Sequence, residues 1–164
     1  MERLYTPWRL SYIREAAKKK MECIFCVDDP SGPDRERLIL RLSPRTIVMC
    51  NRFPYTNGHL LIAPRAHVSD FSEVDAEATE EIFRLIQESI KILRKHYNPE
   101  GFNVGMNMGR VAGAGIEDHV HFHVLPRWAG DTNFMTPVSR VRVLPETVEQ
   151  TFDRLVGDFS RLEL

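Results

Sequence analysis

Three histidines alternate with apolar residues in the C-terminal half of the chain. His119, His121 and His123 are separated by single apolar residues, and successive side chains of a β-strand point to opposite faces. A strand here would place three imidazoles on one face. Aromatic and β-branched side chains suit a structural strand better than imidazole, so the spacing favours a functional cluster. Two chemistries fit it: metal ligation, and nucleophilic attack by a neutral imidazole.

A Cys-x-x-Cys pair, Cys23 and Cys26, is the second feature that could carry chemistry. Three cysteines in the whole chain do not form a secreted disulfide framework, so in a reducing compartment the pair indicates metal binding or redox chemistry. Redox chemistry is the weaker interpretation, because the flanking segment lacks the strand-to-helix context of thioredoxin-like proteins. Cys50 is expected to be a small apolar core residue.

The cysteines fall in a segment that is expected to be irregular. Residues 1–33 form an N-terminal arm, in which a short helix is predicted from Ser11 through Lys20 and a loop at 29–33. Three strands follow, paired as a meander, and the second should show alternating burial. Runs of apolar and β-branched residues place them at 38–42, 45–50 and 60–63.

A long amphipathic helix is the strongest local prediction. Apolar residues recur at three- and four-residue steps over 82–97, which predicts a helix over 72–97 with one buried face. Ser72, with Asp75 three residues later, fits an N-terminal cap. The Asn98-Pro99 step ends the helix, because proline lacks an amide donor and crowds the residue before it.

The remaining elements complete an α+β domain. A strand that carries the histidines is predicted from Asp118 to Leu125, and a closing helix from Pro145 to Leu162. An alternating strand should precede them, with an apolar face made of Phe102, Val104, Met106 and Met108. We therefore expect an antiparallel sheet of about five strands with the long helix packed on it.

Length and charge restrict the class of protein. The 164 residues are 43% apolar, which is typical of one globular domain over 1–164. The 22 basic and 23 acidic side chains nearly balance, so binding to nucleic acid or to a membrane surface is not expected. No apolar run approaches the ~20 residues of a membrane span, and the N-terminal residues lack a signal-peptide pattern. These features predict a cytoplasmic protein.

The pattern His-φ-His-φ-His-φ-φ, where φ is apolar, resembles the signature of the histidine triad (HIT) superfamily of nucleotide hydrolases and transferases. Similar supporting segments are Asn51-Arg52-Phe53-Pro54, Gly58–Pro64, Asn107-x-Gly109, Pro126-Arg127 and Gly130-Asp131. A narrower resemblance, to the bacterial branch that includes diadenosine tetraphosphate phosphorylases, rests on Pro7-Trp8-Arg9, the Cys-x-x-Cys pair and residues 127–135.

The resemblance implies covalent catalysis and a homodimer in which the sheets join. His121 would attack the α-phosphorus of a nucleotide and form a nucleotidyl-imidazole intermediate, which water or phosphate then resolves. Its other ring nitrogen should donate to a fixed acceptor, and a backbone carbonyl is expected there. His123 would donate to the phosphate or to its leaving oxygen. His59, beside Gly58, is expected to be structural.

A structural zinc site is also implied by the resemblance. In bacterial members with the Cys-x-x-Cys pair, the first triad histidine and the histidine after the Pro-x-x turn are zinc ligands. Cys23, Cys26, His67 and His119 match those positions and would form a closed tetrahedral set. The alternative is two buried cysteines and an exposed His67. No organic cofactor is implied.

Phosphate and nucleoside contacts are expected near small and polar residues. Backbone amides around the glycines could hold phosphate oxygens, at Asn107, Gly109, Gly113 and Gly115. Relatives often carry Gln or Ser, then Ser or Thr, where this chain has Gly115 and Ile116, so a hydroxyl donor is missing. This departure leaves room for a phosphate acceptor. Asn51 would hold the ribose or serve as a turn residue, and Trp128 would stack on a purine or cover a dimer seam.

The most specific function consistent with these features is phosphorolysis of diadenosine tetraphosphate to ADP and ATP by adenylyl transfer. The first alternative is a hydrolase of dinucleoside polyphosphates or nucleoside phosphoramidates, which differs only in the acceptor that meets the intermediate. The second is a non-catalytic nucleotide-binding module. Retention of all three histidines favours catalysis over that module.

Overall fold

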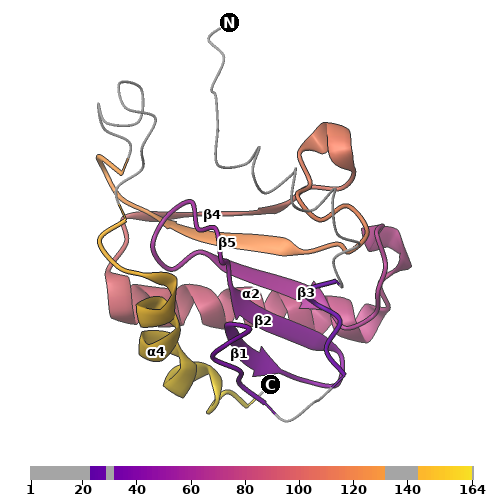
Figure 1. The fold of residues 1–164 in the computed structure, drawn as a ribbon, viewed down its shortest axis with the longest axis horizontal. Helices are drawn as coiled ribbons and strands as arrows, with labels where there is room; N and C mark the ends of the chain where they lie inside the picture. The colour runs from indigo at the N-terminus through magenta and orange to yellow at the C-terminus, as the bar shows by residue number, and fades with distance from the viewer. Residues whose placement is uncertain (1–22, 29–31, 132–143, 164) are drawn as a thin grey trace, which may run out of the picture.

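The computed structural model describes residues 23–28, 32–131 and 144–163 (Figure 1). The helix predicted over 11–20, the Pro7-Trp8-Arg9 motif and residues 132–135 lie outside these ranges. The described part of the expected arm includes the Cys-x-x-Cys pair, which forms a tight turn. The main-chain N–H of Cys26 donates to the oxygen of Cys23 at 3.0 Å.

Five antiparallel strands form one sheet in the order β1-β2-β3-β5-β4 (Figure 1). The predicted meander is confirmed, because β1 pairs with β2 and β2 with β3. The last strand, β5, lies between β3 and the edge strand β4. The strands comprise Ile39–Leu42, Thr46–Cys50, Leu60–Pro64, Gly101–Met106 and Phe122–Arg127, in chain order from β1 to β5.

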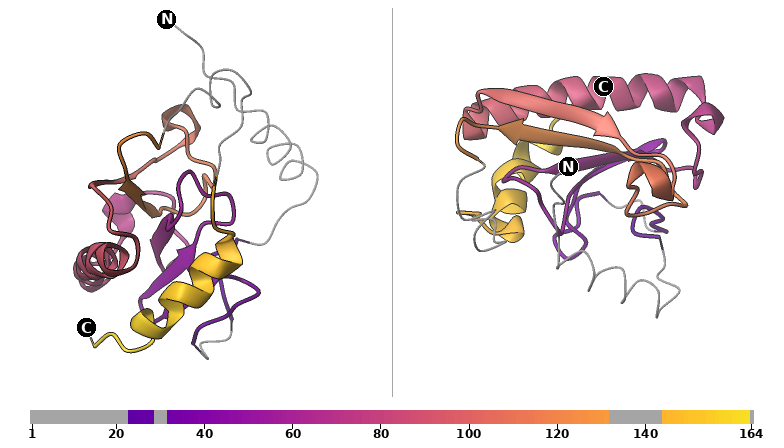
Figure 2. Two further views of the ribbon diagram at one scale, coloured as in Figure 1. Left: turned by 90° about the vertical axis from the view of Figure 1, so that its left-hand side faces the viewer. Right: turned by 90° about the horizontal axis from the view of Figure 1, so that it is seen from above.

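The long helix α2 spans Ala76–Tyr97 and lies along one face of the sheet (Figure 2). Its N-cap is Asp75, whose carboxylate accepts from the N–H of Ala78 at 2.7 Å. The predicted cap at Ser72 was wrong: Ser72 belongs to a 3₁₀ turn, η1 (Phe71–Glu73), and its hydroxyl donates to Asp70. The predicted end is confirmed, because Asn98 adopts the left-handed conformation of a C-cap.

Apolar clusters cover both faces of the sheet. One lies between the sheet and the helices, and the other, on the opposite face, includes Phe25, Val27 and Met49. Every residue of β2 is buried as a result. The predicted alternating burial of this strand was wrong because an apolar layer covers its second face, and that layer comes in part from the Cys-x-x-Cys segment.

The closing helix α4 spans Val148–Phe159, inside the predicted range, and packs against β1 and α2 (Figure 2). A capping box between Thr147 and Gln150 fixes its start. In the described part of the chain, none of the helices is both long and apolar enough to cross a bilayer.

The edge strand β4 departs from its predicted apolar face. Phe102 and Met106 pack against the main core, but Val104 is 43% exposed and Met108 is 44% exposed. The strand has a sheet neighbour, β5, on one side within the described chain, and Met108 lies beyond its end. An edge position therefore leaves half of the expected face open.

Candidate active site and metal cluster

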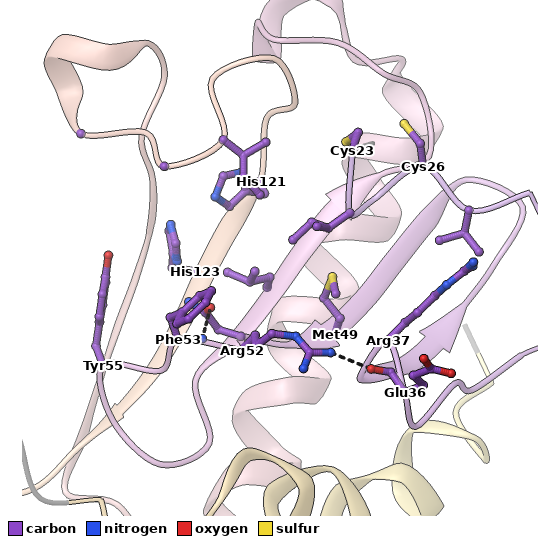
Figure 3. Close-up of a pocket in the computed structure, with 17 residues that line it drawn as sticks. Cys23, Cys26, Glu36, Arg37, Met49, Arg52, Phe53, Tyr55, His121 and His123 are labelled. Atoms are coloured by element: carbon purple, nitrogen blue, oxygen red, sulfur yellow. Dashed lines mark hydrogen bonds between the residues drawn. The ribbon is translucent and has the colours of Figure 1, made fainter. Parts of the chain in front are cut away.

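A cavity of about 460 Å³ opens beside the central strands and contains two of the three histidines (Figure 3). His121 and His123 line one end of it, and Glu36 and Arg37 line the other. Met49 lies between the two ends, and Met49 and Leu61 both supply apolar wall. A volume of this size lies in the range of small-molecule binding sites.

The histidine segment bends before it joins the sheet. β5 begins at Phe122, so the prediction that all three histidines lie within one strand was wrong. The apolar residues between them are buried, as expected. His121 and His123 remain neighbours, with ring centroids 4.9 Å apart, whereas His119 does not line the cavity. The bend thus separates the three imidazoles into two sites.

His121 is held in one tautomer. Its Nδ1 lies 2.9 Å from the main-chain oxygen of His119, and because a carbonyl can only accept, Nδ1 carries the proton. The Nε2 atom then keeps its lone pair. Burial lowers the pKa of His121 below its ordinary value, against the opposing effect of this hydrogen bond, and the side chain is 3% exposed. A neutral imidazole with a free Nε2 lone pair is the form required of a nucleophile.

His123 is oriented by a chain of hydrogen bonds through His59. The N–H of Tyr55 donates to Nδ1 of His59 at 3.1 Å, so a neutral His59 carries its proton on Nε2. That Nε2 lies 2.9 Å from Nδ1 of His123 and donates to it. The proton of a neutral His123 is therefore on Nε2. Sequence reasoning placed His59 among structural residues and gave no signal of this contact.

The four expected metal ligands come together beside the cavity. Their ligand atoms lie within 4.8 Å of one another. Nδ1 of His119 lies 3.2 Å from Sγ of Cys23, and Nδ1 of His67 lies 3.2 Å from Sγ of Cys26. A tetrahedral zinc ion with ordinary bond lengths would separate its ligand atoms by about 3.3–3.8 Å. The cluster is close to that geometry.

The tautomer of His119 also suits a metal. Its Nε2–H donates to the main-chain oxygen of Pro64 at 2.8 Å, which leaves the Nδ1 lone pair facing the two sulfurs. The side chain is completely buried. An imidazole fixed in this way by a backbone carbonyl has the second-sphere support that metal-bound histidines usually have.

The predicted phosphate-binding residues divide into two groups. Gly113 and Gly115 line the cavity, whereas Asn107 and Gly109 do not. Gly109 and Gly113 adopt positive φ angles on either side of the 3₁₀ turn η2 (Arg110–Ala112). The glycines at these two positions are thus required by the turn itself.

Asn51 and Trp128 differ in their relation to the cavity. Asn51 lines it, and its Oδ1 accepts from the N–H of Phe53 at 3.0 Å, so the side chain also stabilises a turn. Trp128 lines a second cavity of about 350 Å³, and its Nε1–H donates to the oxygen of Tyr97. Tyr55 borders both cavities.

The charged end of the cavity was missed in the sequence. Arg37 and Arg52 line it, and the Arg52 guanidinium donates to the main-chain oxygen of Glu36 at 2.6 Å (Figure 3). Arg37 falls in no motif, and Arg52 belongs to the Asn51–Pro54 segment of the family resemblance, which assigned it no binding role. Their position follows from the turns before β1 and after β2, which the linear pattern does not bring together.

The comparisons with known proteins agree with this architecture. A HIT domain model matches residues 35–130, and the chain belongs to the HIT domain family. A relative from Mycobacterium tuberculosis (strain CDC 1551 / Oshkosh), named AP-4-A phosphorylase, is 31% identical over 98% of this chain and 86% of its own length. Adenosine 5'-monophosphoramidase hnt1 of Schizosaccharomyces pombe is 31% identical over 65% of this chain and 75% of its own. Both names describe enzymes that process nucleotides.

Among solved structures, a Zn-bound histidine triad family protein from Mycobacterium smegmatis aligns with a TM-score of 0.60. The alignment covers 76% of this chain and 84% of that chain at 23% identity. It shows a common fold. The predicted α+β fold, with five antiparallel strands, one long helix and a C-terminal helix, is confirmed.

Proposed function

We propose that the protein is a nucleotidyltransferase that works through a covalent nucleotidyl-His121 intermediate, and that its reaction is phosphorolysis of diadenosine tetraphosphate to ADP and ATP. The single observation that carries this proposal is the hydrogen bond from His121 Nδ1 to the His119 oxygen. It leaves a lone pair on Nε2 of a neutral ring at the wall of a nucleotide-sized cavity.

In the first step, Nε2 of His121 attacks the α-phosphorus. A P–N bond forms, the bond from phosphorus to the bridging oxygen breaks, and ATP leaves. His123, 4.9 Å from His121 between ring centroids, supplies the Nε2–H that donates to the leaving oxygen. His59 fixes the orientation of His123, because the Nε2–H of His59 donates to Nδ1 of His123. The Nε2–H of His123 is then left to face the leaving oxygen.

In the second step, inorganic phosphate attacks the phosphorus of the adenylyl-His121 intermediate. The P–N bond breaks, its electron pair returns to Nε2, and ADP leaves. Gly113 and Gly115 line the cavity, and at Gly115 an added Cβ would have no neighbour within 4 Å. This open space supports a small anionic acceptor held by backbone amides. The phosphorylase name of the mycobacterial relative supports the same acceptor.

The Cys/His cluster would hold a structural zinc ion. Cys23, Cys26, His67 and His119 supply two thiolates and two imidazoles, a donor set that zinc prefers. A closed four-ligand site leaves no position for substrate, so the ion would stabilise the fold and take no part in the reaction. A reducing, cytoplasmic compartment would keep both thiols available as ligands. A homodimer is part of the same proposal.

Hydrolysis is the main alternative, since water would resolve the same intermediate to AMP. The phosphoramidase name of the yeast relative supports this alternative, including phosphoramidate substrates. A nucleotide-binding module without catalysis is the third candidate, and it would bind substrate without turnover.

One experiment separates these functions. The protein is incubated with diadenosine tetraphosphate, with and without phosphate, and the products are identified by chromatography. We expect ADP and ATP only when phosphate is present. AMP and ATP at a rate independent of phosphate would mean hydrolysis, and unchanged substrate under both conditions would exclude catalysis on this compound.

A further inference from the structure

One short segment, residues 23–27, belongs both to the metal cluster and to the cavity. Cys23 and Cys26 provide two of the four ligand atoms. The same two residues, together with Ile24 and Val27, line the cavity that contains His121. Any displacement of this segment would therefore change both sites.

Phe25, at the centre of the segment, has its side chain completely buried between the two sites. Its ring centroid lies 5.0 Å from that of His119 and 5.1 Å from that of His121. It also belongs to the core cluster that contains Met49 and Leu61, both of which line the cavity. Phe25 thus contacts one metal ligand and one residue of the reaction centre.

We propose that Phe25 is a positioning residue that couples metal occupancy of the Cys/His cluster to nucleotide binding at His121. This inference rests on the proposed function, because it takes His121 as part of the nucleotide site. A bound metal fixes the sulfurs of Cys23 and Cys26, and these two residues begin and end the tight turn that contains Phe25. The fixed turn holds the Phe25 ring against His121. Loss of the metal leaves this ring held by packing alone, so His121 and the wall at Ile24 and Val27 become less well positioned.

The coupling must be reciprocal, because it is a free energy shared by two binding equilibria. Metal should tighten nucleotide binding, and nucleotide should tighten metal binding by the same factor. Couplings between sites in proteins commonly amount to about 5- to 150-fold. We expect about tenfold here, since the segment is short and one aromatic ring makes the connection.

The test uses zinc and AMP as probes on the full chain. Zinc transfer from the protein to a chromophoric chelator is followed with and without saturating AMP, and the zinc affinity is obtained from a chelator titration. We expect AMP to raise the zinc affinity about tenfold. In the reciprocal measurement, calorimetry should show AMP binding about tenfold weaker after zinc removal, and restored when zinc is returned.

Two matched substitutions separate coupling from stability. Phe25→Leu and Phe159→Leu each shorten a completely buried phenylalanine, but Phe159 lies in the other core cluster, against the helices. Both variants should lose thermal stability. Phe25→Leu should reduce the effect of AMP on zinc affinity to within twofold, whereas Phe159→Leu should keep it near tenfold. Phe25→Met, whose unbranched and flexible side chain reaches further than that of leucine, should give an intermediate effect.

The outcomes distinguish this inference from the function on which it rests. Absence of AMP binding to the zinc-loaded protein would overturn the proposed function. AMP binding with unchanged zinc affinity, or AMP binding that is equally tight with and without zinc, would overturn the coupling alone. Full coupling in Phe25→Leu would show that another contact carries it. The two wild-type measurements decide whether the sites are coupled, and Phe25→Met tests the role of Phe25 if Phe25→Leu does not fold.

Discussion

The Nδ1 atom of His121 lies 2.9 Å from the main-chain oxygen of His119, so the residue that faces the metal cluster also sets the tautomer of the ring in the cavity. The two histidines are separated by one residue, yet they serve different sites. The bend before β5 is what separates them. A side-chain substitution at His119 can alter the metal cluster while its carbonyl still orients His121.

The first prediction concerns the nucleophile. His121→Asn should fold and bind AMP, but its turnover of diadenosine tetraphosphate should fall by at least about three orders of magnitude, because an asparagine amide has no ring-nitrogen lone pair with which to attack phosphorus. Steady-state rates and calorimetric AMP binding are measured on the same preparation. Turnover within tenfold of the parent would exclude the covalent mechanism.

The second prediction concerns His59, which donates to His123. His59→Ala should lower kcat by about 10- to 100-fold with little change in KM, because His123 would lose the donor that fixes its tautomer and orientation, and so lose part of the roughly 10²–10⁴-fold that a positioned proton donor contributes. His59→Gln, which retains an N–H donor, should recover part of the loss. His96→Gln serves as the control, since His96 contacts Asp158 at the far end of α2. An equal loss in His59→Ala and His96→Gln would refute a specific orienting role.

The third prediction concerns zinc. The purified protein should contain about one zinc per chain, and Cys23→Ser should lower both the zinc content and the melting temperature. Cys50→Ala is the matched control. Cys50 is completely buried outside the cluster, and burial raises the pKa of its thiol, which makes it a poor ligand. Metal-free protein that remains folded and active would show that the cysteine pair contributes to packing and does not hold a structural metal.

The fourth prediction concerns stability in acid. Hydrogen bonds from His96 and Lys95 lower the pKa of Asp158 from the usual 3.8 to about 2. A carboxyl group with a lowered pKa in the folded state stabilises the protein above its unfolded pKa, and this contribution is lost as the pH falls toward 2. Asp158→Asn should therefore cost about 1–2 kcal/mol at pH 6, after allowance for solvent screening.

Denaturant unfolding of the parent and of Asp158→Asn across pH 6 to 2 measures this dependence. The difference in unfolding free energy should be constant above about pH 5 and shrink between about pH 4 and pH 2. Glu149→Gln is the control. Glu149 is an acidic residue in the first turn of α4, whereas Asp158 lies near the end of the same helix. A difference that stays constant to pH 2 would contradict the lowered pKa.

Local patterns predicted most elements of the fold but not the contacts between distant ones. The apolar steps of α2 and the runs of β1 to β3 are strong signals because each is repeated within a few residues. The contact between His59 and His123 spans 64 residues and depends on β3 pairing with β5. The helix α2 and the strand β4 lie between β3 and β5 in the chain, so no local spacing predicts this pairing.

The candidate site shows the same division. The family resemblance predicted four metal-ligand positions, and the side chains at these positions lie close together in the structure. The bend that removes His119 and His121 from β5 was not predictable, because alternating residues fit a continuous strand equally well. The helix cap is Asp75 and not Ser72 for a comparable reason. Both side chains have capping chemistry, and the choice between them depends on the 3₁₀ turn that contains Ser72 and ends before Asp75.

The last prediction concerns the acceptor. Gly115 lines the cavity, its backbone is compatible with other residues, and an added Cβ would meet no atom within 4 Å. Gly115→Gln should therefore fold normally while its side chain occupies the space assigned to phosphate. Phosphorolysis should fall about tenfold or more, and slow hydrolysis should change less, because water needs less room than phosphate.

Both products are measured across a phosphate titration in the parent, in Gly115→Gln and in Gly101→Gln. Gly101 has equally open surroundings but lies at the start of β4 and does not line the cavity, so its substitution should leave the product ratio unchanged. In the parent, ADP formation should rise with phosphate until it saturates, as expected for an acceptor that binds before it attacks. A parent rate that does not depend on phosphate would mean that water, and not phosphate, resolves the intermediate.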